Sequence, residues 1–269
     1  KSYALLLILG VPLISIILYF FETLDNAWLY AWGLMSLLSV VMPKIYTQFI
    51  APMFNKFTPL ESGPLRDAIE GYSKEVDFPL TEVYVVDGSK RSAHSNAYFT
   101  GFGKNKRIVL FDTLMDNHTN EEILAILAHE VGHFKKKHII KGMVTSILHS
   151  GIMLYILGLF IKMPELHAAF GMESPQPSVY VGLIFFSLLY APIELILSIF
   201  LNIISRKHEF EADEYSAMTL KNTSHMILGL KNLTVQNLGN LTPHPFPVFL
   251  SYSHPPVLDR IRALNKLEF

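Results

Sequence analysis

Four long apolar stretches constrain the fold of this chain more than any other feature. They are residues 3–21, 27–42, 143–161 and 179–204. An α-helix needs about 20 apolar residues to cross the hydrocarbon core of a bilayer, so each stretch is a candidate membrane span. The second stretch is short, but Trp28 and Tyr30 suit a membrane interface and the helix can extend past Pro43. A buried helical hairpin of a soluble protein is the alternative for the first two stretches.

The composition favours a membrane protein. Of the 269 residues, 51% are hydrophobic and 17% are charged, whereas an ordinary soluble domain has about 25% charged residues. The net charge of −1 gives no indication of nucleic-acid binding. The sequence contains no cysteine, which excludes disulfides, thiolate ligands and a cysteine nucleophile.

Charge and hydropathy together predict the domain organisation. We expect a transmembrane hairpin over 1–50, a soluble part over 51–142, a second transmembrane hairpin over 143–204, and a C-terminal helical part over 205–269. The loops at 22–26 and 162–178 hold a single Lys between them, while 44–141 and 206–266 hold nearly all Lys and Arg. The positive-inside rule therefore places the soluble part and both chain ends on the cytoplasmic side.

The soluble part is predicted to contain a small β-sheet. An amphipathic helix is expected over 65–76, followed by strands over 82–87, 96–102 and 107–111, the last two joined as a hairpin through 103–105. A strand placed just before a metal-binding helix can either receive an extended substrate by edge pairing or be an ordinary sheet edge.

Polar residues within the last two apolar stretches also need an explanation. Pro192 predicts a kink in the fourth span. His149 and Glu194 are costly in hydrocarbon unless they face protein or water. Each can line a polar cavity or form a hydrogen bond inside the helix bundle.

The segment 129–133, HEVGH, has the H-E-x-x-H pattern within a helical sequence. Residues four apart lie on one face of a helix, so His129 and His133 can both bind one metal ion. Glu130 can then contact a water molecule on that ion. Zn²⁺ favours nitrogen ligands and keeps a water position open in catalytic sites. The alternative is a surface helix with two solvated histidines, but the apolar run 125–128 does not suit an exposed face.

A third metal ligand must come from elsewhere in the chain. In the helical segment 205–213, Glu209 and Asp213 share one face, while His208 and Glu211 face away. If Glu209 is the ligand, Asp213 can accept the second ring N–H of either histidine of the motif. His208 is the rival ligand, but no acid follows it one turn later.

Four motifs together resemble the type I CAAX prenyl endopeptidases, integral-membrane zinc metalloproteases of the gluzincin class. They are HEVGH at 129–133, HEFEAD at 208–213, SHPPVLDR at 253–260 and VYVVDGSKRSAHSNAYF at 83–99. The likeness extends over about 51–263 and includes KRIVLFDTL at 106–114. Broader membrane gluzincins share the first two motifs, whereas the SNAYF and SHPP blocks are more selective.

The resemblance implies a metal site with assigned roles. His129, His133 and Glu209 would bind one Zn²⁺ per chain. Glu130 would be the general base and Asp213 the acid that orients a ligand.

The resemblance also implies residues that contact the substrate. His254 would stabilise the tetrahedral oxyanion, and Asn96, Ala97 and Tyr98 would form the edge strand that holds the peptide. Members of the family enclose the site in a chamber walled by seven membrane helices. Four spans are visible here, and the first two resemble the fourth and fifth of the family.

The expected fold class is therefore a mainly α integral-membrane protein with a cytoplasmic-side, gluzincin-like zinc protease domain that contains a small β-sheet. The expected activity is removal of the C-terminal residues of prenylated CAAX proteins in the endoplasmic reticulum or a bacterial inner membrane. Expected partners are the lipid bilayer and a peptide or protein substrate, but no nucleic acid. A quality-control protease of misfolded membrane proteins and a non-catalytic, zinc-stabilised membrane scaffold are the alternatives.

Overall fold

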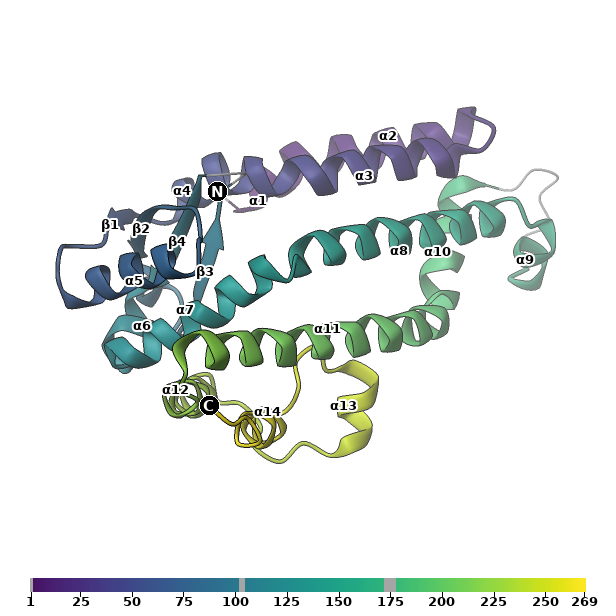
Figure 1. Ribbon diagram of the computed structural model, residues 1–269. Helices are drawn as coiled ribbons and strands as arrows, with labels where there is room; N and C mark the ends of the chain where they lie inside the picture. Colours follow the sequence, from purple (N-terminus) through teal and green to yellow (C-terminus); the bar gives the residue numbers. More distant parts are fainter. Residues whose placement is uncertain (1, 102–104, 172–177) are drawn as a thin grey trace. The chain divides into compact units, whose positions relative to one another are not determined.

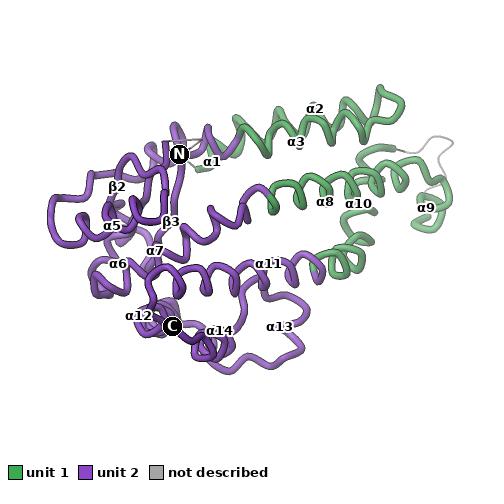
Figure 2. Tube along the Cα trace, in the orientation of Figure 1, with its two compact units in different colours: residues 1–41, 141–198 green, residues 42–140, 199–269 purple. Residues whose placement is uncertain are grey.

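The computed structural model describes residues 2–101, 105–171 and 178–269. The chain divides into two compact units, one from Lys1–Val41 and Lys141–Ser198 and the other from Met42–Ile140 and Ile199–Phe269 (Figure 2). We refer to them as the helical unit and the mixed unit.

The helical unit contains the candidate membrane spans. Helices α1 (Ser2–Leu5) and α2 (Val11–Thr23) are joined by a π-helical turn, Leu6–Gly10, into one continuous helix. The other helices are α3 (Ala27–Ile45), α8 (His138–Ile161), α9 (Pro164–Ala169), α10 (Val179–Leu189) and α11 (Ala191–Leu220) (Figure 1). Parts of α3, α8 and α11 belong to the mixed unit.

Three helical segments of the described chain are long and apolar enough to cross a membrane. They are Ser2–Thr23, Ala27–Phe54 and His138–Ile161, and a fourth span is present if α10 and α11 are counted as one. Between 6% and 17% of each span is buried within the protein, so their apolar side chains face outward, as lipid contact requires. Within the described residues, the two stretches predicted as transmembrane hairpins, 1–50 and 143–204, consist mainly of helices.

The kink predicted at Pro192 is present. Helices α10 and α11 meet at Tyr190 with a bend of 56°. Pro192 has no N–H to donate to the preceding turn, and its ring excludes the carbonyl four residues earlier.

The expectation of a loop over 162–178 was wrong in part, because this segment contains the short helix α9. Pro164 suits the first turn of such a helix.

Aromatic and polar contacts join the helices of the helical unit. The Trp32 indole donates a hydrogen bond of 2.7 Å to the carbonyl of Ile147, and Gly151 gives Trp32 room, since a Cβ there would lie 3.0 Å from the ring. His149 Nε2 and Glu194 Oε2 lie 2.9 Å apart. The two polar side chains of these apolar stretches therefore contact each other, and the Glu194 side chain is 41% exposed.

The strands of the mixed unit form one sheet in the order β1-β2-β4-β3 within the described residues. The strands are β1 (Phe57–Pro59), β2 (Leu80–Val86), β3 (Ala97–Thr100) and β4 (Lys106–Phe111). The predicted β3–β4 hairpin is confirmed as an antiparallel pair, although residues 102–104 of its turn lie outside the described residues. Strands β2 and β4 pair in parallel, and β1 was not predicted.

The mixed unit also contains several helices besides the part of α11 that enters it. They are α4 (Ala51–Phe54), which continues α3 through the π-helical turn Tyr46–Ile50, then α5 (Pro64–Glu75), α6 (Asp112–Asn117), α7 (Asn120–Lys135), α12 (Ser224–Gln236), α13 (Pro245–Ser251) and α14 (Val257–Leu264). A core that includes Ile69, Val83, Leu110 and Leu127 joins α5, the sheet and α7. It fixes α7 relative to the strand edge at β3.

Close packing of α7 on α11 depends on Gly132, the fourth residue of HEVGH. A Cβ at this position would lie 3.1 Å from Ala212 Cα, Ala212 O and Tyr215 Cβ. The two helices that carry the motif histidines and the HEFEAD segment can therefore approach each other only because residue 132 has no side chain.

Gly132→Ala is expected to destabilise the protein by about 1–3 kcal/mol, because overpacking forces the two helices apart. Thermal unfolding in detergent measures the effect. Gly71→Ala in α5 is the matched control, since a Cβ there meets nothing within 4 Å and alanine raises helix propensity. Equal stability of Gly132→Ala and the parent protein would contradict this packing account.

Candidate metal centre

The N-terminus of α7 is fixed by the capping box that the sequence predicts. Thr119 Oγ1 accepts from the N–H of Glu122, and the Glu122 carboxylate accepts from the N–H of Thr119, both at 3.3 Å. Asn232 of α12 also donates to Glu122, at 3.0 Å. These contacts satisfy N–H groups that a helix start leaves free, and they anchor the helix that presents His129 and His133.

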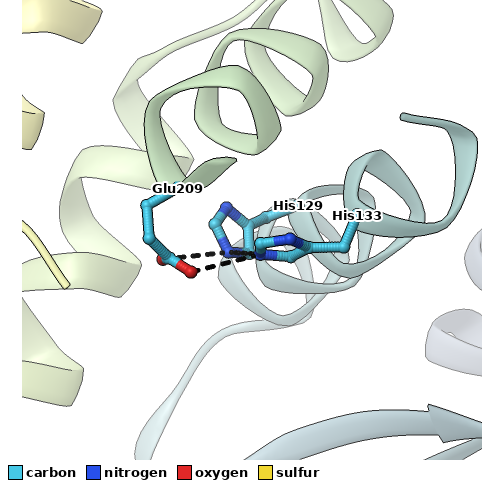
Figure 3. A group of neighbouring side chains, drawn as sticks. All are labelled: His129, His133 and Glu209. Atoms are coloured by element: carbon cyan, nitrogen blue, oxygen red, sulfur yellow. Dashed lines mark hydrogen bonds and ion pairs between the residues drawn. The ribbon is translucent and has the colours of Figure 1, made fainter. Parts of the chain in front are cut away.

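Three side chains from α7 and α11 converge on one point (Figure 3). His129 Nε2 and His133 Nε2 are 3.1 Å apart. Glu209 Oε1 lies 3.3 Å from His133 Nε2, and Glu209 Oε2 lies 3.6 Å from His129 Nε2. The Glu209 side chain is 8% exposed, so the carboxylate meets the histidines in a largely enclosed place.

The spacing of these donor atoms fits a metal ion. Bonds of about 2.0–2.2 Å at tetrahedral angles place ligand atoms about 3.3–3.6 Å apart, which is close to the separations observed here. The hydrogen bond from His129 Nδ1 to a carboxylate puts its ring proton on Nδ1, so Nε2 presents a lone pair. Lone pairs of nitrogen and oxygen that face each other at this distance repel unless a cation lies between them. The cluster can therefore hold a divalent cation.

A buried carboxylate and a guanidinium support His129. Asp213 Oδ1 lies 2.8 Å from His129 Nδ1, and Arg260 of α14 donates to both Asp213 oxygens at 2.6 and 2.7 Å. Arg260 Nη1 also lies 3.3 Å from Glu209 Oε2. Of the two motif histidines, His129 is thus the partner of Asp213, and Arg260 keeps the Asp213 carboxylate charged and oriented.

Glu130 and His254 line an open pocket of about 630 Å³ beside the converging donors. Loss of hydration raises the pKa of the Glu130 carboxyl. His254 Nε2 lies 3.5 Å from Glu209 Oε1, and the His254 side chain is 66% exposed. Within the described residues the Glu130 carboxylate accepts no hydrogen bond, and it lies at the wall of the pocket.

The segment that leads into β3, together with the first residue of that strand, forms another wall of the pocket, through His94, Ser95, Asn96 and Ala97. Within the described residues β3 pairs with β4 on one side only, so it is an edge strand. Tyr98 follows on the same strand, with its ring 6.3 Å from that of Phe111. The structure therefore brings Asn96 and Ala97 to the pocket together with Glu130, while Tyr98 packs on the sheet.

Several residues near the site were not identified by the sequence. Arg260, to which the sequence analysis assigns no role, pairs with Asp213. Arg206 donates to the carbonyls of Val248 and Tyr252. These bonds fix α13 on α11 and do not involve the metal-site carboxylates. Asn237, the residue after α12, binds the backbone N–H of Ser95 at 3.1 Å. Of these three residues, Arg260 alone lies in one of the four motifs, SHPPVLDR at 253–260.

Comparison with known families agrees with this architecture. Residues 59–268 match the profile of peptidase family M48, and residues 1–56 match the profile described as the CAAX prenyl protease N-terminal region with five membrane helices. The helical spans, the mixed unit and the His-His-Glu donor cluster are together those of a membrane metallopeptidase. The chain belongs to peptidase family M48. It is an integral membrane protein, and the resemblance to the CAAX prenyl endopeptidases is confirmed.

Individual relatives give the degree of similarity. The human CAAX prenyl protease 1 homolog is 37% identical over all of this chain and 64% of its own length. CAAX prenyl protease 1 of Saccharomyces cerevisiae is 37% identical over 98% of this chain and 62% of its own length. The crystal structure of S. mikatae Ste24p superposes with a TM-score of 0.89 at 35% identity and covers 98% of this chain. The chain spans less than two thirds of these proteins.

Proposed function

We propose that the protein is a zinc metalloendopeptidase of the membrane that removes the C-terminal residues of prenylated CAAX proteins. The observation that carries the proposal is the convergence of His129, His133 and Glu209 beside a free carboxylate, Glu130, and an open strand edge. We further propose that the site faces the cytoplasm, in the endoplasmic reticulum or a bacterial inner membrane. The names of the relatives, CAAX prenyl proteases, support the choice of substrate.

In this proposal His129, His133 and Glu209 hold one Zn²⁺, with Asp213 as the acid that orients His129. When bound, Zn²⁺ supplies Lewis acidity, which polarises a carbonyl and lowers the pKa of a neighbouring water molecule. Glu130 accepts the proton of the attacking water and delivers it to the amine that leaves. Enclosure of Glu130 supports this role, because a raised pKa makes the carboxylate a stronger base toward the proton of the water molecule.

The peptide substrate is proposed to pair with the free edge of β3. The carbonyl of Asn96 accepts from Phe111 on β4 at 3.1 Å, so the N–H of Ala97 turns toward the free edge. At present the Asn96 side-chain oxygen accepts from this N–H at 2.8 Å. A substrate carbonyl could replace that oxygen, and edge pairing of this kind reads the main chain with little side-chain selection.

His254 is proposed to donate a hydrogen bond to the oxyanion. Ser253 Oγ lies 3.0 Å from His254 Nδ1, and a proton donated there leaves the ring proton on Nε2. His254 Nε2 lies at the pocket, on the side of Glu209. These contacts support a role for His254 as a hydrogen-bond donor toward the reacting carbonyl.

His254→Phe is expected to lower kcat by about 100-fold with a much smaller change in KM, because a donor to the oxyanion acts chiefly in the transition state. Steady-state kinetics on a quenched fluorescent peptide measure both constants. His244→Phe, a change in a histidine that caps α13, is the control. An unchanged kcat in His254→Phe would make His254 a structural residue.

The substrate is tested with a farnesylated CAAX peptide and its unprenylated twin, each incubated with detergent-purified protein with and without a chelator. We expect the prenylated peptide to be cleaved faster, and the chelator to stop both reactions. Equal rates for both peptides would favour the quality-control alternative. Cleavage of neither peptide, with zinc still bound, would favour the scaffold alternative.

A further inference from the structure

The sequence carries a further histidine, His138, five residues after His133, that no motif assigns. We infer that His138 and Glu211 are positioning residues that fix the orientation and tautomer of the proposed metal ligand His133. The inference rests on the zinc site proposed above. It gives His133 a support chain of its own, separate from the Asp213–Arg260 pair that holds His129.

A break between two helices brings His138 back to His133. Helix α7 ends at Lys135 and α8 begins at His138. Lys137 between them has φ of 58°, the left-handed conformation that a residue with a side chain rarely adopts. In an uninterrupted helix a residue five positions on lies about 140° around the axis and faces away. The reversal at Lys137 lets His138 face the far side of the His133 ring.

The contacts form a continuous hydrogen-bonded chain. His133 Nδ1 and His138 Nδ1 are 3.0 Å apart, and His138 Nε2 lies 2.9 Å from Glu211 Oε2. The His138 side chain is 4% exposed and that of Glu211 is 27% exposed. The chain thus runs from the metal cluster through a buried imidazole to a carboxylate at the edge of the protein.

Proton positions in this chain follow from its last member. An ionised carboxylate only accepts, so His138 carries its proton on Nε2 and presents a lone pair at Nδ1. His133 must then donate from its own Nδ1, which leaves the lone pair of its Nε2 toward His129 and Glu209. Glu211 therefore selects, through His138, the tautomer of His133 that can bind a metal ion. A ligand whose other nitrogen donates to such a partner is also more basic.

Packing holds the chain in place. The ring of His138 stacks on that of His208 with centroids 4.0 Å apart and an angle of 12° between the planes. His208, the rival ligand in the sequence, thus faces His138, while Glu209 of the same helix faces the metal cluster. The acidic residue that the sequence placed away from the site, Glu211, lies on the same side as His208.

The test compares four variants of the full chain purified in detergent. His138→Phe keeps an aromatic ring for the stack but removes the acceptor for His133. His138→Asn returns an acceptor oxygen close to the position of Nδ1. Glu211→Gln allows the amide to donate and so releases the fixed proton pattern. His208→Phe keeps an aromatic ring stacked on His138 and leaves His133, His138 and Glu211 themselves unchanged, so it is the control.

The readouts are the Zn²⁺ Kd from competition with a chromogenic chelator and the visible spectrum of the Co²⁺-substituted protein. We expect His138→Phe to raise the Zn²⁺ Kd by about 10- to 100-fold and to alter the Co²⁺ spectrum. Glu211→Gln should raise the Kd by about 10-fold, and the Kd of His138→Asn should lie between those of His138→Phe and the parent. The Kd of His208→Phe should stay within about twofold of the parent. A Kd within about twofold of the parent in both His138→Phe and Glu211→Gln would overturn the inference. If His138→Phe does not fold, Glu211→Gln decides.

Failure of this inference is distinguishable from failure of the proposed function. If the parent protein binds no Zn²⁺, the metal site itself is wrong, and the positioning role falls with it. If zinc binds but no peptide is cleaved, the endopeptidase is wrong and the effect of His138 on Kd still stands. If cleavage occurs and the Kd is insensitive to His138 and Glu211, only the positioning role is wrong.

Discussion

Glu130→Gln is expected to abolish peptide cleavage while leaving the metal in place. Glutamine has nearly the same shape as glutamate but cannot accept a proton at neutral pH, so the proposed water attack loses its base. Loss of general acid–base catalysis lowers kcat by about 10²–10⁴-fold. Glu130 lies outside the cluster of converging donors, so the Zn²⁺ content should remain that of the parent protein.

Single-turnover cleavage of the farnesylated peptide, with metal content measured on the same sample, separates the two effects. Glu214→Gln is the matched control, because it makes the same chemical change on α11 at a residue outside the pocket lining. If the Glu130→Gln variant cleaves the peptide at the rate of the parent protein, Glu130 is not the general base. Glu130→Gln that loses zinc would mean that the carboxylate is a ligand.

Glu209→Ala is expected to release the metal. The cluster would retain only two imidazoles, whereas a catalytic zinc site normally has three protein ligands. The loss in Zn²⁺ affinity should exceed the roughly 10- to 100-fold that follows removal of a residue behind a ligand. Elemental analysis after dialysis against a weak chelator measures the retained zinc.

His208→Phe is the control for Glu209→Ala, because His208 is the neighbouring residue and the rival ligand. It should keep its zinc, since His208 stacks on His138 and does not face the cluster. The reverse result, with zinc lost in His208→Phe and kept in Glu209→Ala, would transfer the third ligand to His208.

Features that depend on local sequence were predictable. The apolar stretches became helices because length and hydropathy alone specify a span, and the bend at Tyr190 follows from Pro192. The facing of His129 and His133 follows from helical spacing. Glu209 was preferred to His208 by the same geometry, and the two residues do lie on different faces.

Features that depend on distant contacts were not predictable. Strand β1 has three residues, one of them Pro59, and shows no period of two. Arg260 reaches Asp213 from 47 positions along the chain, and no pattern couples an arginine of one helix to an aspartate of another. The role of His138 depends on a backbone reversal at Lys137, a lysine whose left-handed conformation has no signature in the sequence.

The central claim is that one zinc ion lies between two turns of α7 and a carboxylate of α11. Diffraction data collected on both sides of the zinc absorption edge, from crystals of the protein prepared without added metal, test it directly. The account predicts one anomalous peak within bonding distance of His129 Nε2, His133 Nε2 and a Glu209 oxygen. No peak there, or a peak at other residues, would contradict it.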